Sequence, residues 1–539
     1  MRFTHEPTRE ELEALAGPAL PLLRELALPA GRAEEAPFDP SPLFRRHPLP
    51  GGRLFNKALL LRVYRHLVAT GRIGEIPGLE ALLQVKRIRT LSGVAPVAVL
   101  TGPHPCPGKC LFCPSEPGLP KSYLSGEPGA MRALRLGFDP FLQTRERIRA
   151  LSRNGHPVDK VELLVLGGTW SAYPYLYRRD FLKRCLDAMN GEEASTLEEA
   201  QALNEKAPHR EVGLVVETRP DMVTPEEVRL LREEGATKVQ LGAQALDDRI
   251  LEINRVGYSL EDIRRAVTLL KRAAFKVVLH WMPNLPGSDP ARDLEDFGRL
   301  FSDPALRPDE LKIYPCTLVE GAELKELFAR GEWRPYPEER LVDLVARCKK
   351  EVPSYCRINR VFRDIPAPAI LAGCRKANLR HLVQERLAQW GRACRCLRCL
   401  EVRSRPRDPA GLELVDLVYS SRAGEEHFLS FRTGEGRVAG FLRLLLPSPQ
   451  GPDPGIPEIR GAALVREVHV YGPALPLGGR KEGAAQHQGL GRRLMARAEE
   501  ISRGSGFRRV AVIAGVGTRP WYASLGYERS GTYMMRRIF

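Results

Sequence analysis

Hydrophobic and polar residues follow different patterns in successive parts of this 539-residue chain. Over roughly the first 80 residues, apolar positions recur at the three- and four-residue spacing of a helix, most clearly at 56–68. The segment 8–13 opens on Thr and carries Glu three residues later, which is the form of a capped helix start. Proline-rich sequence at 36–50 separates the two stretches. This pattern predicts a helical N-terminal region.

From residue 95 the pattern changes to short apolar segments, each followed by a polar or glycine-containing turn and then a helical stretch. Six such segments predict strands at 96–100, 161–167, 212–217, 238–242, 276–280 and 311–314, with helices between them that include 226–234, 260–273 and 291–301. Alternation of strands and helices favours a parallel sheet with right-handed crossovers. Six units are too few to close an eight-stranded barrel, so we expect an open, partial (β/α)6 barrel.

The last 130 or so residues have a third pattern. Strand-like segments occur at 428–432, 438–446, 464–472 and 509–513, with one helical segment at 486–499. This pattern predicts a separate domain of mixed α/β structure. The expected fold class is therefore α/β and multidomain. We divide the chain into a helical region at 1–80, a partial barrel at 81–360, a connector at 361–410 and a second domain at 411–539.

The formal net charge of +16 is unevenly distributed along the chain. Residues 1–50 contain 6 Lys/Arg and 8 Asp/Glu, whereas residues 357–407 contain 12 Arg and 1 Lys but only 3 acidic residues. A segment this rich in arginine is typical of a surface that binds a polyanion, because guanidinium groups hold phosphates in bidentate fashion and stack on unpaired bases. A solvated basic surface is the alternative interpretation.

The sequence predicts neither a membrane span nor a secretory signal. There is no run of about 18 apolar residues, and the first residues are polar and acidic. The 11 cysteines are odd in number and include two tight clusters, which favours metal sites in a reducing compartment over a disulfide framework. We therefore expect a cytoplasmic protein.

Three cysteines lie close together directly after the first predicted strand. Cys106, Cys110 and Cys113 have a Cys-x3-Cys-x2-Cys spacing. Three thiolates on a short loop can hold three irons of a [4Fe–4S] cluster and leave the fourth iron open to a small molecule. Structural zinc sites use two close pairs of ligands instead, so a zinc loop completed by a distant residue such as His104 is the alternative.

The cysteine spacing resembles that of the radical S-adenosylmethionine (SAM) superfamily. The resemblance implies that the open iron binds SAM and cleaves it reductively to a 5′-deoxyadenosyl radical. It also gives a role to the turn Gly167, Gly168 and Thr169, which ends the second predicted strand where such proteins bind the methionyl amine of SAM. Cofactors of these barrels bind at the C-terminal ends of the strands, and glycines there let the backbone approach a ligand closely.

A second cluster of three cysteines lies within the arginine-rich segment: Cys394, Cys396 and Cys399. Three thiolates within six residues are typical of a structural zinc knuckle that takes its fourth ligand from elsewhere. We expect His427 to be that ligand, with Cys374 and His381 as alternatives. Three unrelated free cysteines are the other interpretation, although clustered exposed thiols are prone to oxidation.

The second domain contains a glycine-rich turn that opens a helix: Gln488, Gly489, Leu490, Gly491 and Arg492. Backbone N–H groups in such a turn can hold a pyrophosphate at the positive end of the helix. A strand precedes the turn, another strand follows the helix, and Tyr522 opens a Tyr-x-x-x-Gly-Tyr segment near the end of the chain. This order resembles the acetyl-CoA motif of the GNAT acetyltransferases. The resemblance implies that Tyr522 approaches the CoA sulfur as an acid or an orienting group.

The complete layout resembles the family of Elongator catalytic subunits over roughly residues 80–539. That family combines a radical SAM barrel, a basic cysteine-bearing connector and a GNAT domain. Segments with closely similar sequence lie at 89–99, 122–133, 217–221, 311–315, 363–368, 466–472 and 486–491. The short cluster loop and the lack of a strongly basic tail in the first 50 residues indicate a prokaryotic, stand-alone member.

This resemblance implies a tRNA-modifying enzyme that forms 5-carboxymethyluridine at the wobble position. The radical would take a hydrogen from the methyl group of acetyl-CoA, and the resulting carbon would join C5 of uridine. Hydrolysis of the thioester would then leave a carboxymethyl group. The expected partner is the anticodon stem-loop of tRNA, and a homodimer is left open. The sequence does not identify the electron donor.

Further site residues take their roles from the same resemblance. Lys160 matches a lysine that contacts acetyl-CoA. The strand whose backbone pairs with the pantetheine arm would be Glu467, Val468, His469 and Val470. Lys312 and Tyr314, at the end of the last barrel strand, would orient the base or the acetyl group. Gln244 and His280, also at strand ends, would line the SAM site.

Two other functions are compatible with the same sequence. An amine or protein acetyltransferase whose barrel serves as a scaffold uses the GNAT motif but leaves the open-iron cluster without a role. A non-catalytic tRNA-binding or iron–sulfur adaptor explains the charge but leaves two cofactor sites unused.

Overall fold

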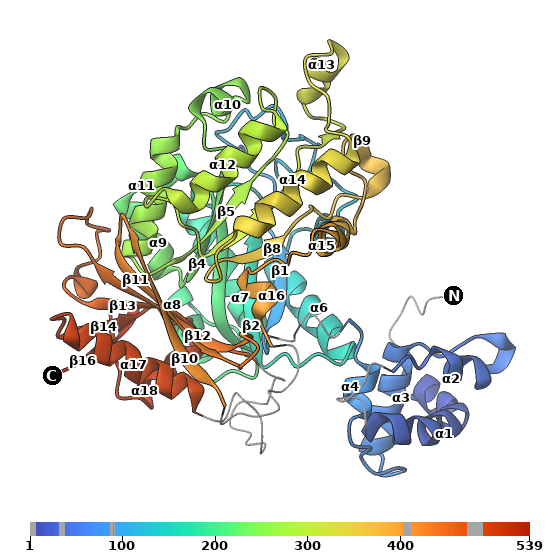
Figure 1. The fold of residues 1–539 in the computed structure, drawn as a ribbon. Helices are drawn as coiled ribbons and strands as arrows, with labels where there is room; N and C mark the ends of the chain where they lie inside the picture. Colours follow the sequence, from blue (N-terminus) through green and yellow to red (C-terminus); the bar gives the residue numbers. More distant parts are fainter. Residues whose placement is uncertain (1–6, 32–37, 87–89, 91, 403–410, 472–488) are drawn as a thin grey trace.

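A computed structural model describes residues 7–31, 38–86, 90, 92–402, 411–471 and 489–539. It contains a small helical part and two seven-stranded sheets that pack against each other (Figure 1). Short 3₁₀ segments occur at Pro50–Gly52, Trp170–Ala172, Pro220–Met222, Ala367–Ala369, Pro457–Ile459 and Val516–Thr518. Among the described helices, none is long and apolar enough to cross a membrane.

The helical part consists of α1 (Arg9–Gly31), α2 (Ser41–Arg46), α3 (Lys57–Ala69) and α4 (Leu79–Leu83). Its leucines pack in a core of their own, which accounts for the helical spacing of apolar residues in this region. The side chain of Asn56 caps α3 by accepting the Leu59 N–H. This part lies at one side of the molecule beside α6 (Pro140–Arg153), where Arg65 donates to the Ser152 carbonyl (Figure 1).

The first sheet is entirely parallel, in the order β1-β2-β3-β4-β5-β6-β8. Its strands are β1 (Ala95–Leu100), β2 (Lys160–Leu166), β3 (Arg210–Thr218), β4 (Lys238–Gln244), β5 (Lys276–Trp281), β6 (Glu310–Ile313) and β8 (Arg357–Arg360). The helices that precede or connect these strands are α5 (Pro128–Arg135), α6, α7 (Tyr175–Asn190), α8 (Leu197–Asn204), α9 (Pro225–Glu233), α10 (Asp248–Ile253), α11 (Leu260–Arg272), α12 (Pro290–Ser302), α13 (Leu324–Ala329) and α14 (Glu338–Glu351). Because β1 and β8 stand at opposite ends of the strand order, the curled sheet is an open, partial barrel (Figure 1).

The partial barrel confirms the predicted fold class and corrects the expected number of strands from six to seven. All six predicted strands are present, with ends within two residues of those expected. The missed strand, β8, has only four residues, and three of them are Arg or Asn. No apolar run therefore marks it in the sequence. It joins the sheet through β6, and the Arg357 N–H donates to the Asp309 carbonyl at 3.0 Å.

The described part of the connector between the two large sheets contains β9 (Ile370–Ala372), α15 (Leu379–Gln389) and α16 (Leu397–Leu400). Strand β9 pairs with β7 (Leu318–Val319), which lies after β6 in the barrel part of the chain. The helix α16 carries Cys399 and lies against β8, because the Leu397 N–H donates to the Cys356 carbonyl just before that strand.

The second sheet has the order β10-β11-β12-β13-β14-β16-β15. Its elements are β10 (Glu413–Ser421), β11 (Gly424–Arg432), β12 (Val438–Pro447), β13 (Ala463–Val470), α17 (Leu490–Gly504), β14 (Arg509–Val512), α18 (Arg519–Ala523), β15 (Glu528–Ser530) and β16 (Tyr533–Arg537). All neighbouring strands are antiparallel except β13 and β14, which are parallel. The mixed α/β structure expected for this part of the chain is therefore confirmed.

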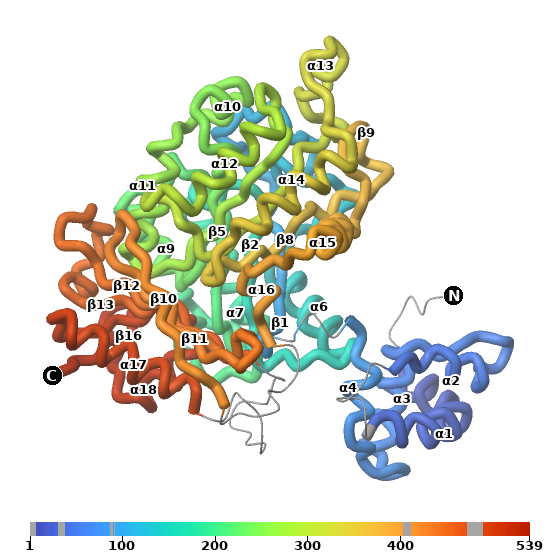
Figure 2. Tube along the Cα trace, viewed as in Figure 1, coloured from blue at the N-terminus to red at the C-terminus, as the bar shows by residue number. Residues whose placement is uncertain are grey.

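The second sheet lies against the N-terminal ends of the barrel strands. Two glycines after β14 make this approach close: a Cβ atom on Gly515 would lie 2.6 Å from the Val212 carbonyl carbon, and one on Gly517 would lie 2.5 Å from the Arg210 Cβ. In the chain trace of Figure 2, the C-terminal segment in orange and red accordingly lies against the green part of the barrel.

Buried ion pairs bind the two sheets together. Arg466 of β13 donates to Asp309 at 2.9 Å and to Glu426 at 2.7 Å, and Lys271 of α11 donates to Glu426 at 2.6 Å. These side chains are almost completely buried. A buried charge without a partner is strongly unfavourable, so these pairs specify how the second sheet docks on the barrel.

Candidate functional site

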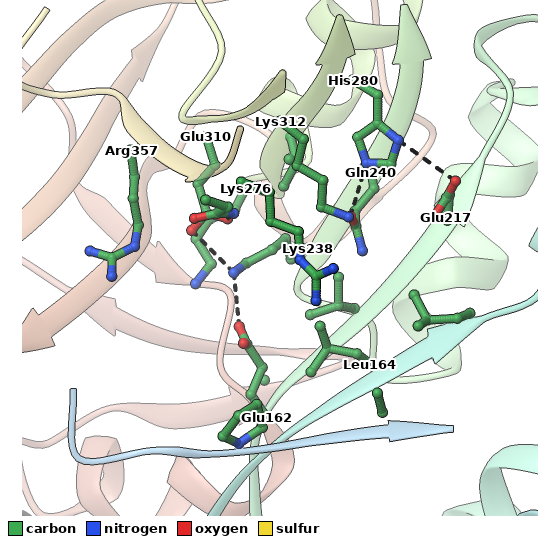
Figure 3. Close-up of a pocket in the computed structure, with 18 of the residues that line it drawn as sticks. Glu162, Leu164, Glu217, Lys238, Gln240, Lys276, His280, Glu310, Lys312 and Arg357 are labelled. Atoms are coloured by element: carbon green, nitrogen blue, oxygen red, sulfur yellow. Dashed lines mark hydrogen bonds and ion pairs between the residues drawn. The ribbon is translucent and has the colours of Figure 1, made fainter. Parts of the chain in front are cut away.

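A cavity of about 1070 Å³ extends through the barrel to the second sheet. Its wall is formed by inward-facing residues of the barrel strands, several of which are drawn in Figure 3. Cys113 lines it near the C-terminal ends of the strands, and residues 467–470 and Tyr522 line it near their N-terminal ends. One continuous space therefore connects the first cysteine loop with the strand and tyrosine predicted to contact acetyl-CoA.

The first cysteine loop follows β1, and its three thiols are half-buried. Cys106 Sγ accepts the Gly108 N–H at 3.4 Å and lies 3.5 Å from the Thr169 hydroxyl. A hydrogen bond between Cys110 and Cys113 raises the pKa of the Cys110 thiol and lowers the pKa of the Cys113 thiol. This favours the thiolate of Cys113, which is the form that binds iron.

Arg219, which follows β3, extends beneath the loop. A Cβ atom on Gly108 would overlap its guanidinium, so a larger residue at that position would displace Arg219. Asp221 holds the guanidinium through two hydrogen bonds of 3.0 and 2.9 Å, and the Tyr258 ring stacks on it at 5.0 Å. A fixed positive charge next to three thiolates suits a cluster that carries net negative charge.

The donor set of this loop fits an iron–sulfur cluster better than a single zinc ion. A cubane presents its irons at separate corners, so its three cysteines need to stand further apart than the ligands of one ion. Within the described ranges, only the Cys394 group has three potential ligands whose donor atoms all lie within 4.8 Å. His104, the alternative zinc ligand, lies 2.9 Å from the Ala172 carbonyl oxygen and stacks on Tyr173 at 4.6 Å.

The turn Gly167–Thr169 lies beside the cysteine loop and requires its glycines. Gly167 and Gly168 have φ angles of 134° and 96°, and a Cβ atom on Gly167 would overlap the Thr101 hydroxyl. The Tyr173 hydroxyl lies 3.1 Å from the Gly167 carbonyl and 2.8 Å from the Gly102 carbonyl. The backbone of this turn is therefore fixed in place next to the cysteine loop.

Gln244 and His280 both line the cavity near the C-terminal ends of their strands. Gln244 ends β4 with a φ of 62°, a conformation that is uncommon for residues other than glycine and often occurs at functional sites. His280 lies 3.0 Å from Gln240 and 3.7 Å from Glu217. Burial lowers the pKa of His280 well below its usual range, so the imidazole is neutral at pH 7.

Lys312 and Tyr314 face the same part of the cavity from the end of β6. Burial lowers the pKa of Lys312 to about 8 despite the nearby carboxylate of Glu217. The Lys312 ammonium lies 5.8 Å from the centre of the Tyr314 ring, and that ring meets His280 edge-to-face at 5.5 Å. These groups form a polar surface that can both donate and accept hydrogen bonds.

Three charged residues inside the barrel were not predicted. Lys238 donates to Glu162 at 2.8 Å and to Glu310 at 3.1 Å (Figure 3). Asn359 donates to the second carboxylate oxygen of Glu310 at 2.6 Å. The signal was present in the sequence: β2, β4 and β6 carry polar residues two positions apart, and alternate residues of a strand share one face.

The strand β13 separates from its neighbour where it reaches the cavity. It pairs with β14 only over Ala463–Val465, whereas its pairing with β12 continues to Val470. The backbone of residues 466–470 is therefore available on the β14 side to an extended ligand with amide groups. Val468 and Val470 pack toward the core beneath α17, and His469 stacks on Phe441 at 5.8 Å.

Charged and aromatic side chains surround this strand edge. Glu467 accepts from Lys276 at 3.0 Å and from Arg443 at 2.9 Å, and these cations lower the pKa of Glu467 although burial opposes the shift. Burial raises the pKa of Tyr522, so its phenol stays protonated at neutral pH. Lys160, at the start of β2, also lines the cavity, and burial lowers its pKa.

The N-terminus of α17 begins at the predicted glycine turn. Gly489 precedes the helix with a φ of 72°, and a Cβ atom on Gly491 would lie 3.2 Å from the Trp521 ring. Leu490 is buried in the core, whereas Arg492 is exposed. Gln488 lies outside the described residues. Among the residues that the structure describes, no side chain caps α17 at Gly489, so the first N–H groups of this 15-residue helix can bind an anion.

The second cysteine group is assembled as expected, but its proposed histidine is elsewhere. The Sγ atoms of Cys394, Cys396 and Cys399 all lie within 4.8 Å of one another. His427 is not part of this group, because its ring is held by Asp416 at 2.9 Å and Glu425 at 3.2 Å on the β10–β11 hairpin. The prediction of His427 as fourth ligand is therefore incorrect.

The two alternative ligands are not in this group either. The His381 ring lies 3.3 Å from Glu385 on the exposed face of α15, and Cys374 is buried outside the group. Within the part of the chain that the structure describes, the three thiols thus form an incomplete tetrahedral donor set.

Comparisons with known proteins agree with this geometry. Residues 104–300 match the family model of the Radical SAM superfamily, and residues 308–389 match that of the Radical_SAM C-terminal domain. The tRNA uridine(34) acetyltransferase of Methanocaldococcus jannaschii is 43% identical over 469 residues, which cover 84% of this chain and 86% of that protein. Elongator complex protein 3 of Danio rerio is 39% identical over 475 residues, which cover 85% and 86% of the two chains.

A solved structure has the same fold. It is that of archaeal Methanocaldococcus infernus Elp3 with an N-terminal deletion (1–46), and it matches with a TM-score of 0.71 and 39% sequence identity. The match covers 83% of this chain and 99% of that chain.

Proposed function

The chain belongs to the radical SAM family that includes tRNA uridine(34) acetyltransferases and Elongator complex protein 3, and from this premise we propose that it modifies the wobble uridine of tRNA with a carbon unit from acetyl-CoA. Membership of this enzyme family confirms the resemblance seen in the sequence. The proposed product is 5-carboxymethyluridine.

One observation carries the proposal: the same cavity is lined by Cys113 at one end and by β13 and Tyr522 at the other. A scaffold for a simple acetyltransferase has no need of this connection. An enzyme that activates a methyl group of acetyl-CoA needs it, because the group that removes the hydrogen and the carbon that loses it must meet in one water-restricted space.

The cluster end of the cavity has the residues needed to hold SAM. Cys106, Cys110 and Cys113 would bind three irons of a [4Fe–4S] cluster, as membership of the superfamily implies. The backbone at Gly167–Thr169, which lies next to Cys106, would bind the methionyl group of SAM, and Gln244 and His280 of the cavity wall would contact the bound molecule. When bound, the cluster and SAM would supply the 5′-deoxyadenosyl radical.

The second-sheet end has the form of an acetyl-CoA site. The N–H groups at the start of α17, at Gly489, Leu490, Gly491 and Arg492, would bind the pyrophosphate. The open edge of β13 would pair with the pantetheine amides, and the acyl end would enter the cavity past Tyr522. Lys160 lines the same cavity at the start of β2, where it can contact the cofactor.

Lys312 and Tyr314 would orient the reacting groups, since both face the space between the two ends. The tRNA would be held by the arginine-rich connector, and we propose Arg395 and Arg398 among its phosphate contacts. Charge reversal at these two positions should weaken tRNA binding and reduce its salt dependence, whereas SAM cleavage without tRNA should be retained.

We further propose that the thiols of Cys394, Cys396 and Cys399 bind a structural zinc ion, whose fourth ligand is open. This site would order the connector of residues 361–410 between a barrel unit of 81–360 and a GNAT-type unit of 411–539, with residues 1–80 as a separate helical unit. The expected observation is one zinc per chain, lost in Cys396→Ser, with the iron content unchanged.

An isotope experiment tests the reaction. With acetyl-CoA labelled at the methyl carbon, the label should appear in a carbon-linked group on uridine, and only when SAM and a reductant are present. Replacing Cys106, Cys110 and Cys113 by Ala should remove about four irons and abolish transfer. Transfer of label to nitrogen without SAM, and no carbon-linked product under reducing conditions, would instead identify an amine acetyltransferase.

A further inference from the structure

Lys238 lies between the two ends of the cavity (Figure 3). It is level with Val215 of β3 and Lys276 of β5, whereas Gln240, two residues further along β4, is level with Glu217 near the cluster end. Its charge interacts with Glu467 of β13 on one side and with Lys312 of β6 on the other. The ammonium of Lys238 therefore belongs to the wall of the cavity between the second sheet and the cluster end.

The two carboxylates beside Lys238 keep it charged. Burial alone would lower the pKa of Lys238, but Glu162 and Glu310 raise it above its usual value. An ammonium group has three N–H donors, and two acceptors are found for them among the described residues, at 2.8 and 3.1 Å. One donor thus remains for a ligand, in a position fixed by the two ion pairs.

The surroundings restrict what that ligand can be. Leu164 and Val215, which pair at this level of the sheet, present apolar side chains to the cavity. The carboxylates of Glu162 and Glu310 would repel a phosphate or another anion. The matching ligand is therefore an uncharged oxygen acceptor on a small apolar group, such as the carbonyl of an acyl thioester.

We propose that Lys238 donates a hydrogen bond to the thioester carbonyl oxygen of acetyl-CoA and so places its methyl group in the barrel. This inference rests on the proposed function, because it assigns a position to the acyl group of that reaction. Lys238 would keep its proton throughout, and Glu162, Glu310 and Asn359 would hold it in position.

The hydrogen bond would assist the step that activates the methyl group. One C–H bond of the methyl breaks, and the hydrogen atom with its electron forms a C–H bond at the 5′ carbon of deoxyadenosine. The unpaired electron left on the acetyl carbon would be delocalised onto the carbonyl oxygen without a change in net charge, and the hydrogen bond from the ammonium would hold that carbonyl, and so the methyl group, in a fixed orientation during the transfer. No further oxidant or reductant is consumed in this step.

A binding comparison tests the assignment without radical chemistry. Acetyl-CoA and S-ethyl-CoA differ only in that a CH2 group replaces the carbonyl. Calorimetry on the full-length protein without SAM should show that the wild type prefers acetyl-CoA roughly 10- to 100-fold, the range for a hydrogen bond to a charged donor. In Glu162→Gln/Lys238→Gln, which removes one charge of each sign, the preference should fall to near one while S-ethyl-CoA binding is retained.

Glu162→Gln alone is the matched control and should keep the preference, because Glu310 still holds the ammonium. Persistence of the preference in the double variant, or equal binding of both ligands by the wild type, would overturn the role of Lys238. Failure of the wild type to bind either CoA compound would instead contradict the proposed function.

A second measurement covers the case in which the double variant does not fold. Lys238→Arg keeps the positive charge but moves the donors, so the infrared carbonyl stretch of bound, ¹³C-labelled acetyl-CoA should differ from that in the wild type. An unchanged stretch would also overturn the proposal.

Discussion

Gly167 lies in the turn beside the first cysteine loop, where the methionyl group of SAM is proposed to bind. Its φ of 134° and its contact with Thr101 leave no room for a side chain. We expect Gly167→Ala to weaken SAM binding at least 10-fold, since both strain and overlap displace the backbone that would hold the methionyl group. Equilibrium dialysis with SAM measures this effect, and the iron content should be unchanged.

The control is Gly298→Ala in α12, where a Cβ atom would meet nothing within 4 Å. This variant should bind SAM as the wild type does. Equal SAM affinity in the Gly167 and Gly298 variants would exclude the turn as part of the SAM site.

The buried side chain of Lys312 leads to a prediction about how uridine modification depends on pH. Burial lowers its pKa to about 8, so the ammonium is present below that pH and is lost as the pH rises through it. If its positive charge orients the base or the acetyl group, uridine modification should decline above pH 8. The decline should disappear in Lys312→Arg, because a guanidinium stays protonated over the accessible range. Rates of product formation from pH 6.5 to 9.5 provide the test, and the same decline in both proteins would argue against this role.

At the scale of elements, the N-terminus of α17 and the edge of β13 form the two halves of the proposed CoA site. Neither is sufficient alone: the helix supplies N–H groups for an anion, and the strand edge supplies pairing for an extended arm. The separation of β13 from β14 opens the strand edge at the cavity.

Gly489→Glu tests the helix half. The new side chain would require a strained φ of 72° and would place a negative charge next to the proposed phosphate site. CoA binding measured by calorimetry should be lost, and the iron–sulfur spectrum should be retained. Gly504→Ala at the other end of α17 has open space and serves as the control. Undiminished CoA binding by the Gly489 variant would place the pyrophosphate elsewhere.

The strands of the barrel also show where prediction from hydrophobic periodicity fails. The six apolar barrel strands were found because hydrophobic runs mark them, whereas β8 was missed because its four residues are mostly polar. Its place in the sheet depends on pairing with β6, which is a contact between distant segments and leaves no local pattern.

At the scale of the whole molecule, the buried ion pairs couple the barrel to the second sheet. Burial opposes ionisation of Asp309, but Arg466 and Arg443 lower its pKa to about 2. Arg466→Met would remove the main partner and leave a buried carboxylate, at an expected cost of about 3–5 kcal/mol of unfolding free energy. Chemical denaturation should therefore show a weaker transition in which the second sheet separates first.

An exposed pair provides the control for this experiment. Arg460 and Asp453 lie at the surface, so Arg460→Met should change the unfolding free energy by less than about 1 kcal/mol. A similar loss of stability in both variants would mean that the buried pairs do not couple the sheets.

The same ion pairs predict a dependence of stability on pH. Because the pKa of Asp309 is lowered in the folded protein, the contribution of its carboxylate to the unfolding free energy is present above about pH 4 and is lost as the pH falls toward 2.

The sequence by itself determined the features that depend on contiguous residues. The cysteine spacing, the alternation of strands and helices and the glycine turn before α17 are local patterns, and their chemistry follows from residue type and spacing. These patterns were enough to indicate two cofactor sites and the family. The combination of motifs, and not any one of them, made the indication specific.

Only the tertiary structure decided how these sites are related. The cavity that joins them, the Lys238 ion pairs from three strands and the absence of His427 from the second cysteine group all depend on strand register and on the docking of the two sheets. Such contacts join residues far apart in the chain. They are determined by the packing of complete elements against one another, and no periodicity within a single segment records them.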